Sequence, residues 1–114
     1  MDFIMRTAAY DILPTPVRRS LKKMGRDIRV ARKRRRLTIA MMMERVGVSK
    51  MTYLAVEKGN PRVGIGIYGT ALMVVGLGTP FADVADSARD DEGLALDEAR
   101  LPERIRPRSG EPAL

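Results

Sequence analysis

Cysteine, histidine and tryptophan are absent from this chain of 114 residues, and aromatic residues make up only 4% of it. Without cysteine and histidine there can be no disulfide scaffold, no zinc site with thiolate or imidazole ligands, no cysteine nucleophile and no serine–histidine triad. Carboxylates are the main catalytic groups left, and we expect neither an enzyme nor a bound metal or cofactor. Because aromatic rings are so few, a core has to be built from Leu, Ile, Val and Met.

Positive charge is in excess but unevenly distributed. The 21 Lys and Arg exceed the 14 Asp and Glu, which gives a net charge of +7. Residues 1–62 carry a balance of +11, whereas residues 63–114 carry a balance of −4. Eleven cations fall within residues 18–36, where Asp27 is the only acid. An anionic partner such as nucleic acid would relieve their mutual repulsion, although a solvated helix face has the same pattern.

An uncharged run of twenty residues, 63–82, has the length of a membrane-spanning helix. Five glycines and a proline interrupt it, so we expect two buried helical segments instead. Within it, residues 64–69 spell G-x-G-x-x-G, but a turn-forming sequence precedes them where a dinucleotide site needs a strand. The first residues do not read as a secretory signal. We therefore expect a cytoplasmic protein; a nucleic-acid partner, as the basic run suggests, would associate it with the nucleoid.

Hydrophobic periodicity predicts an all-α fold. Apolar residues between 17 and 31 recur at spacings of three and four, which predicts a helix ending near Arg35, with Thr15 as its N-cap and Pro16 at its first position. Two shorter helices are expected next, the first capped by Thr38 and the second by Ser49.

The remaining sequence predicts two more helices and sets the domain limits. A fourth helix is expected over about 66–77, and a fifth after residues 79–80, with Phe81 and Val84 facing inward. We expect an N-terminal tail over 1–14, a helical domain over 15–88, and an acidic, then proline-rich, tail over 89–114. Within that tail, residues 94–100 have the composition of a short helix.

Residues 38–59 form the most informative pattern: a short helix, a turn centred on Gly47, and a helix ending in Glu-Lys-Gly. This is helix-turn-helix spacing, in which the second helix can enter the major groove of DNA while the first spans the phosphates. The alternative is a helical bundle with a chance turn. The positions expected to pack the two helices together are all apolar or aromatic: Met42, Val46, Val48, Tyr53 and Val56.

The motif Thr38…Gly47-Val48-Ser49…Glu57-Lys58-Gly59-Asn60-Pro61 resembles the Xre/Cro/lambda-repressor-like helix-turn-helix family. The resemblance implies a five-helix lambda-repressor-like DNA-binding domain with a flexible C-terminal tail. The Leu-Pro-x-Pro at 13–16, the basic first helix and the segment 101–106 are further similar to HipB-like antitoxins of type II toxin-antitoxin systems. That similarity implies a sequence-specific transcriptional regulator that is the antitoxin and autorepressor of a HipA-type kinase toxin. A free-standing Xre-family repressor without a toxin remains the alternative.

The family pattern also implies which residues contact DNA. Lys50 would donate to a guanine and Met51 would contact a thymine methyl group, while hydroxyls and cations would meet phosphates. Arg45 and Arg62 are further phosphate candidates. The cations of 32–36 are expected to clamp the DNA backbone. The residues expected to contact DNA are Thr38, Ile39, Ser49, Lys50, Met51, Thr52, Ala55, Lys58, Arg34 and Arg35.

The sequence departs from the pattern of this family at several positions. Ile39 stands where Gln is usual and Met43 where Ala is usual, and Leu54 and Ala55 occupy positions that are often polar. Glu57 is expected to form a local ion pair rather than read a base.

Since one helix in one groove gives little affinity, we expect a homodimer on a palindromic site. The surface around Val74, Leu77, Phe81 and Val84 is either its interface or ordinary core.

Overall fold

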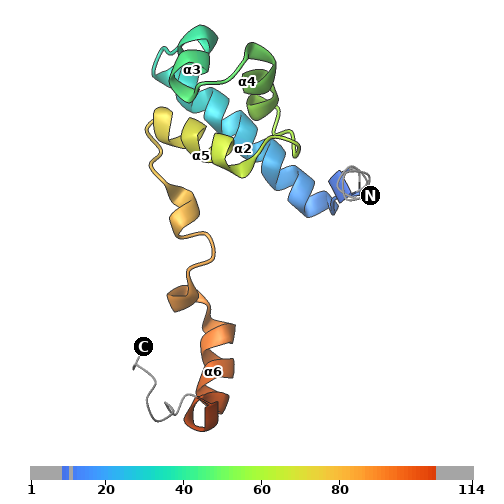
Figure 1. Ribbon diagram of the computed structural model, residues 1–114, viewed down its shortest axis with the longest axis vertical. Coiled ribbons are helices and arrows are strands. Elements are labelled where there is room, and N and C mark those ends of the chain that lie inside the picture. The colour runs from blue at the N-terminus through green and yellow to red at the C-terminus, as the bar shows by residue number, and fades with distance from the viewer. Residues whose placement is uncertain (1–8, 11, 105–114) are drawn as a thin grey trace. The chain divides into compact units, whose positions relative to one another are not determined.

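The computed structural model describes residues 9–10 and 12–104, and in this part of the chain it contains five α-helices, two short 3₁₀ turns and no strand. The expected all-α class is therefore confirmed for these residues. Residues 105–114 and most of the expected N-terminal tail lie outside the description. The chain divides into two compact units between Pro80 and Phe81, so the expected domain 15–88 spans parts of both. Figure 1 shows the helices α2–α6.

Helix α2, Thr15–Arg34, is the longest element and carries nine of the 21 Lys and Arg residues. Ile28 and Ala31 are buried, as the periodicity predicts; Leu21 and Met24 of the same apolar stripe are half-buried, and Val17 at its start is exposed. The expected cap is wrong: Pro14 occupies the N-cap position and no side chain caps the helix. Pro16 still lies in the first turn, where its missing N–H leaves no hydrogen bond unmade.

Helices α3, Ile39–Val46, and α4, Lys50–Glu57, follow with the predicted caps. Thr38 Oγ1 accepts a hydrogen bond from the Met41 amide at 3.0 Å, and Ser49 Oγ accepts one from the Thr52 amide at 3.2 Å. Gly47 ends α3 with a φ of +80°, a conformation that favours glycine. A helix, a glycine turn and a second helix thus stand where the sequence predicted them.

Helix α5, Ile65–Val74, closes the core of the first unit. Its Tyr68, Ala71 and Leu72 are buried, together with Val75 just after it. Figure 1 shows α3, α4 and α5 gathered around one end of α2. The five predicted packing positions are confirmed, because three are fully buried and two are partly buried against the core cluster: Met42, Tyr53, Val56, Val46 and Val48.

Two glycines let α2 and the end of α4 approach closely. A Cβ placed on Gly25 would lie 2.6 Å from the Glu57 carbonyl oxygen and 2.6 Å from the Gly59 amide nitrogen. Gly59 is buried, has a φ of +68°, and has the backbone of Leu21 against it. Neither position has room for a side chain, so these glycines fix how near the basic helix lies to α4.

The second unit differs from the sequence expectation. The fifth helix expected after residues 79–80 is wrong: the chain forms a 3₁₀ turn at Pro80–Ala82 and another at Ser87–Arg89, and Val84 is 73% exposed. Helix α6, Asp91–Arg104, instead occupies sequence expected to be mostly tail. Asp90 starts it by accepting a hydrogen bond from the Gly93 amide at 3.0 Å, and acidic residues in the first turn favour this helix end.

The uncharged run does not form one long helix. Ten of its residues form α5, and the others lie in irregular segments on either side and in the short 3₁₀ turn at Pro80–Ala82. Among the helices of the described residues, none has the length and apolar character needed to cross a membrane.

Candidate nucleic-acid interface

The start of α4 presents a group of exposed side chains. Lys50 is exposed and Met51 is 82% exposed, the largest exposed fraction among the large hydrophobic side chains described. Ser49 fixes the cap, and its hydroxyl also donates to Thr52 Oγ1 at 3.2 Å. Behind these residues, Tyr53 and Val56 anchor the helix in the core. The buried side of α4 thus holds the helix in place, while the ammonium group of Lys50 and the flexible apolar side chain of Met51 extend from its exposed side.

The other predicted contact residues of the two helices are divided between surface and core. Thr38 is exposed at the start of α3. Ile39 is half-buried and packs against the core cluster, so its side chain contributes to packing and is not a free contact residue. Thr52 and Ala55 are half-buried on α4, and Lys58 is exposed at its C-cap.

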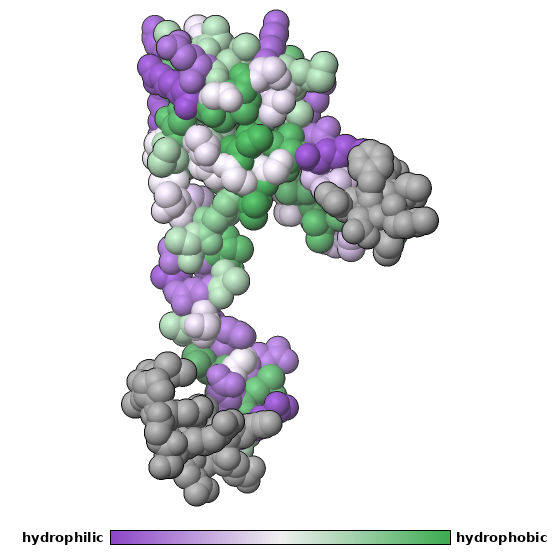
Figure 2. Space-filling model, viewed as in Figure 1, coloured by the Kyte–Doolittle hydropathy of each residue, from purple (hydrophilic) through white to green (hydrophobic). Residues whose placement is uncertain are grey.

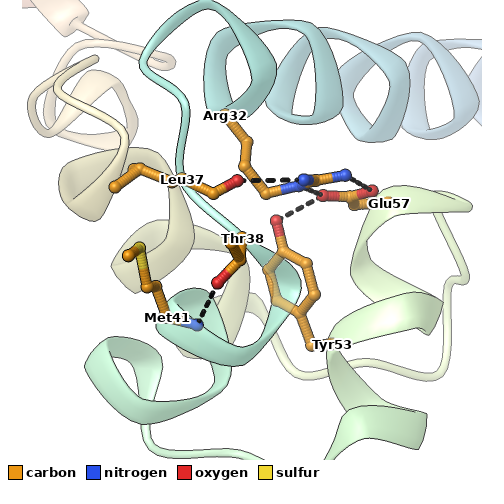
Figure 3. A network of polar contacts seen from close by, with 6 residues as sticks. All are labelled: Arg32, Leu37, Thr38, Met41, Tyr53 and Glu57. Carbon is orange, nitrogen blue, oxygen red and sulfur yellow. Dashed lines mark hydrogen bonds and ion pairs between the residues drawn. The ribbon is translucent and has the colours of Figure 1, made fainter.

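A buried polar network joins α2 to the end of α4 (Figure 3). Arg32 Nε donates to Glu57 Oε2 at 2.6 Å, its Nη2 donates to Glu57 Oε1 at 3.2 Å, and its Nη1 donates to the Leu37 carbonyl at 3.1 Å. The Tyr53 hydroxyl donates to the same Glu57 Oε2. The Arg32 and Glu57 side chains are only 9% and 8% exposed.

This network corrects two expectations. Arg32 does not belong to a phosphate clamp, because its guanidinium is buried and fully directed to Glu57 and Leu37. Glu57 forms an ion pair, as expected, but with a residue 25 positions earlier rather than with a local one. A bidentate arginine–carboxylate pair has a fixed geometry, so the network sets the orientation of α4 on α2.

The protonation states within the network follow from its contacts. The hydrogen bond to Glu57 raises the pKa of Arg32 although burial opposes this, so the guanidinium remains charged. Burial, then the hydrogen bond to Glu57, raises the pKa of Tyr53 well above its ordinary value, so the phenol remains a neutral donor. A buried pair of this kind contributes less to net stability than to a defined geometry, because desolvation offsets much of the attraction.

The other cations of the 32–36 run are closer to the surface. Arg34 is exposed. Arg35 is exposed overall, but its guanidinium donates to the Ala31 carbonyl at 3.0 Å and lies beside Gly76. Arg36 has a φ of +56°, which turns the chain between α2 and α3. Arg34 is therefore the better placed of the two predicted phosphate contacts in this run.

The surface of the first unit is strongly basic. Between residues 12 and 80 the only acids are Asp27, Glu44 and Glu57, and Glu57 is buried. Lys23 pairs with Asp27 at 2.7 Å on the exposed side of α2. Figure 2 shows, on the face in view, hydrophilic side chains around the edge of the first unit and apolar ones in its middle. Such a surface attracts a polyanion.

No group of three or more potential metal-ligating side chains occurs among the described residues. The ion-pair partner of Arg32 was not predicted from the sequence, although one signal was present. Arg32 follows the buried Ile28 by four residues and so lies on the same face of the helix.

Comparison of the chain with protein-family models, with curated proteins and with solved structures found no match of any of the three kinds.

Proposed function

We propose that this protein is a sequence-specific DNA-binding transcriptional regulator that places the N-terminal end of α4 in the major groove. The observation that carries the proposal is the exposure of Lys50 and Met51 on a helix whose opposite side is fixed in the core. A lysine can donate to the O6 and N7 atoms of guanine, and a methionine can contact the methyl group of thymine. Side chains held rigidly at a helix start suit such contacts.

The charge of the first unit supports the same proposal. Exposed cations on α2, among them Arg34, and Lys58 at the end of α4 add positive charge to the unit that contains the helix-turn-helix. Phosphate contacts of this kind position a protein on DNA and supply most of its nonspecific affinity. Two copies of the chain would read the two halves of a palindromic site.

A role as an antitoxin is the second part of the proposal. It rests on the similarity of the sequence to HipB-like antitoxins and on the second unit, which is compact in itself and rich in acids. In this proposal the first unit represses transcription and the second unit binds a HipA-like kinase toxin. Removal of residues 81–114 should abolish capture of a kinase encoded beside this gene while DNA binding is retained. Equal capture by both forms would contradict this part.

The DNA-binding proposal is tested by selecting duplexes from a random pool with the full-length protein at about 150 mM salt. We expect a palindromic consensus, bound at least about 1,000-fold more tightly than a shuffled duplex. Fluorescence anisotropy with the selected and the shuffled duplex provides the comparison. A pool that yields no consensus, with equal affinity for both duplexes, would overturn the proposal.

A further inference from the structure

A pocket of about 320 Å³ lies where α2 passes the turn that follows α4. It is distinct from the start of α4, because its residues come from the N-terminal half of α2 and from the segment after Glu57. Its described lining includes Tyr10, four basic residues and Asn60, the basic residues being Arg18, Lys22, Lys58 and Arg62.

The pocket is positively charged. Four of its lining residues are cations, and none of the described lining residues is an acid. Two acids of the described part of the chain that flank these elements are engaged elsewhere: both carboxylate oxygens of Glu57 accept hydrogen bonds within the buried network, and Asp27 pairs with Lys23. Lys22 and Lys58 are exposed and approach the pocket from two different elements. A bound anion would reduce their repulsion.

The wall formed by residues 59–62 is held in place without a ligand. The Tyr68 hydroxyl donates to the Asn60 carbonyl at 2.6 Å, and Asn60 Oδ1 accepts a hydrogen bond from the Arg62 amide at 2.8 Å. The Arg62 guanidinium lies over the Tyr10 ring, 5.5 Å from its centroid. Because these groups are ordered in advance, a ligand would lose little affinity to their immobilisation.

We infer that this pocket binds a phosphate group. Two lysine side chains that approach from different elements, as Lys22 and Lys58 do, can bind a phosphate through charge-assisted hydrogen bonds. The volume is near the lower limit of about 300 Å³ for small-molecule pockets, so a sugar attached to the phosphate fits as well. The phosphate can belong to the backbone of DNA or to a free nucleotide, and only the first source rests on the proposed function.

The length of α4 is compatible with a phosphate that belongs to the backbone of DNA. A helix of eight residues is about 12 Å long, so a duplex that meets Lys50 at one end carries several phosphates over the distance to Lys58 at the other. Binding in the pocket would then extend the contact along one strand beyond the bases that α4 reads. It would add affinity for every sequence without adding preference for any.

The test compares two double variants of the full-length protein that each remove two positive charges from exposed positions. Lys22→Gln with Lys58→Gln alters the pocket, and Arg19→Gln with Lys23→Gln alters α2 outside it. One arm measures the affinity for a short duplex of random sequence. The other follows the Gly59 and Asn60 amide signals by NMR during titration with inorganic phosphate and with a nucleoside 5′-monophosphate.

If DNA supplies the phosphate, the pocket variant should bind the random duplex about tenfold more weakly than the control variant does. If a free nucleotide supplies it, saturable shifts of the two amides should appear with the monophosphate and vanish in the pocket variant. Equal affinities of both variants for the duplex, together with no saturable shift, would overturn the inference. A protein without base preference can still pass this test, so its failure is separable from failure of the proposed function.

Discussion

Arg32 and Glu57 are 25 residues apart in the sequence, yet Nε of Arg32 lies 2.6 Å from Oε2 of Glu57 and both side chains are less than one tenth exposed. This contact joins the longest and most basic helix to the last residue of α4. The Tyr53 hydroxyl completes it from within α4. The position of the side chains proposed to read DNA thus depends on a pair of buried charges at the other end of the same helix.

The first prediction concerns this pair. Replacing Arg32 by Met leaves the Glu57 carboxylate buried without its charged partner and should lower the free energy of unfolding by about 3–5 kcal/mol. Combining Arg32→Met with Glu57→Leu should be less harmful than the sum of the two single changes, because no charge then remains buried. Urea unfolding followed by circular dichroism measures all three variants. The exposed pair provides the control: Lys23→Gln with Asp27→Asn should change stability by less than about 1 kcal/mol. Additive losses at Arg32 and Glu57 would contradict the predicted coupling.

The second prediction concerns the close approach of α2 and α4. Alanine at Gly25 would place its Cβ 2.6 Å from backbone atoms of Glu57 and Gly59, so the helices must separate at a loss of about 1–3 kcal/mol or more. Gly66 in α5 is the matched control, since nothing lies within 4 Å of a Cβ there. Gly66→Ala should be neutral or stabilise the protein by about 0.5–1 kcal/mol. Thermal unfolding of both variants checks this, and similar melting temperatures for the two would refute the packing argument.

The third prediction concerns alkaline pH. Burial raises the pKa of Tyr68 to about 12, whereas an unfolded tyrosine has a pKa near 10. Below about pH 10 the phenol is protonated in both states and has no effect. As pH rises from about 10 towards 12, only the unfolded state loses the proton, so stability should fall by about 1.4 kcal/mol per pH unit for this residue. The pKa of Tyr53 is raised in the same direction.

Tyr68→Phe separates this effect from the titration of lysines. Near pH 8 the variant should be about 1 kcal/mol less stable, because it loses the hydrogen bond to the Asn60 carbonyl. Between pH 10 and 12 its stability should decline less steeply than that of the unchanged protein. Urea unfolding at several pH values compares the two slopes. Parallel curves over this range would show that Tyr68 does not contribute.

The fourth prediction concerns salt. If about six phosphates are neutralised, the logarithm of the DNA association constant should fall against the logarithm of salt concentration with a slope of about −5. Arg34→Ala should make this slope less steep by about one. Anisotropy titrations between about 50 and 200 mM salt provide the measurement. A slope near zero would mean that the basic surface of α2 does not meet a polyanion.

The features that the sequence predicted well are local ones. Thr38 and Ser49 cap their helices through hydrogen bonds that span three residues, and Gly47 turns the chain by its own backbone conformation. Such signals lie within one turn and need no knowledge of the rest of the fold. The packing positions Met42 and Tyr53 follow from helical periodicity in the same way.

The features that the sequence did not predict depend on distant contacts or on weak local preferences. Arg32 stands among four other cations of similar appearance, and only the crossing of α2 and α4 shows that it alone meets Glu57. Tyr10, Lys22 and Lys58 line one pocket although they are far apart in the sequence, and their meeting likewise depends on how the helices pack. After Pro80 the sequence predicted a helix, but the chain forms a 3₁₀ turn there, and α6 begins only at the cap that Asp90 provides.

The central claim, that the start of α4 reads bases, is tested most directly by comparing Lys50→Ala with Arg34→Ala on the selected duplex and on its single-base variants. We predict that Lys50→Ala weakens binding to the selected duplex by about 1–3 kcal/mol and removes the preference at one base pair, whereas Arg34→Ala weakens binding to every duplex alike. Equal losses on all duplexes for both variants would contradict the claim.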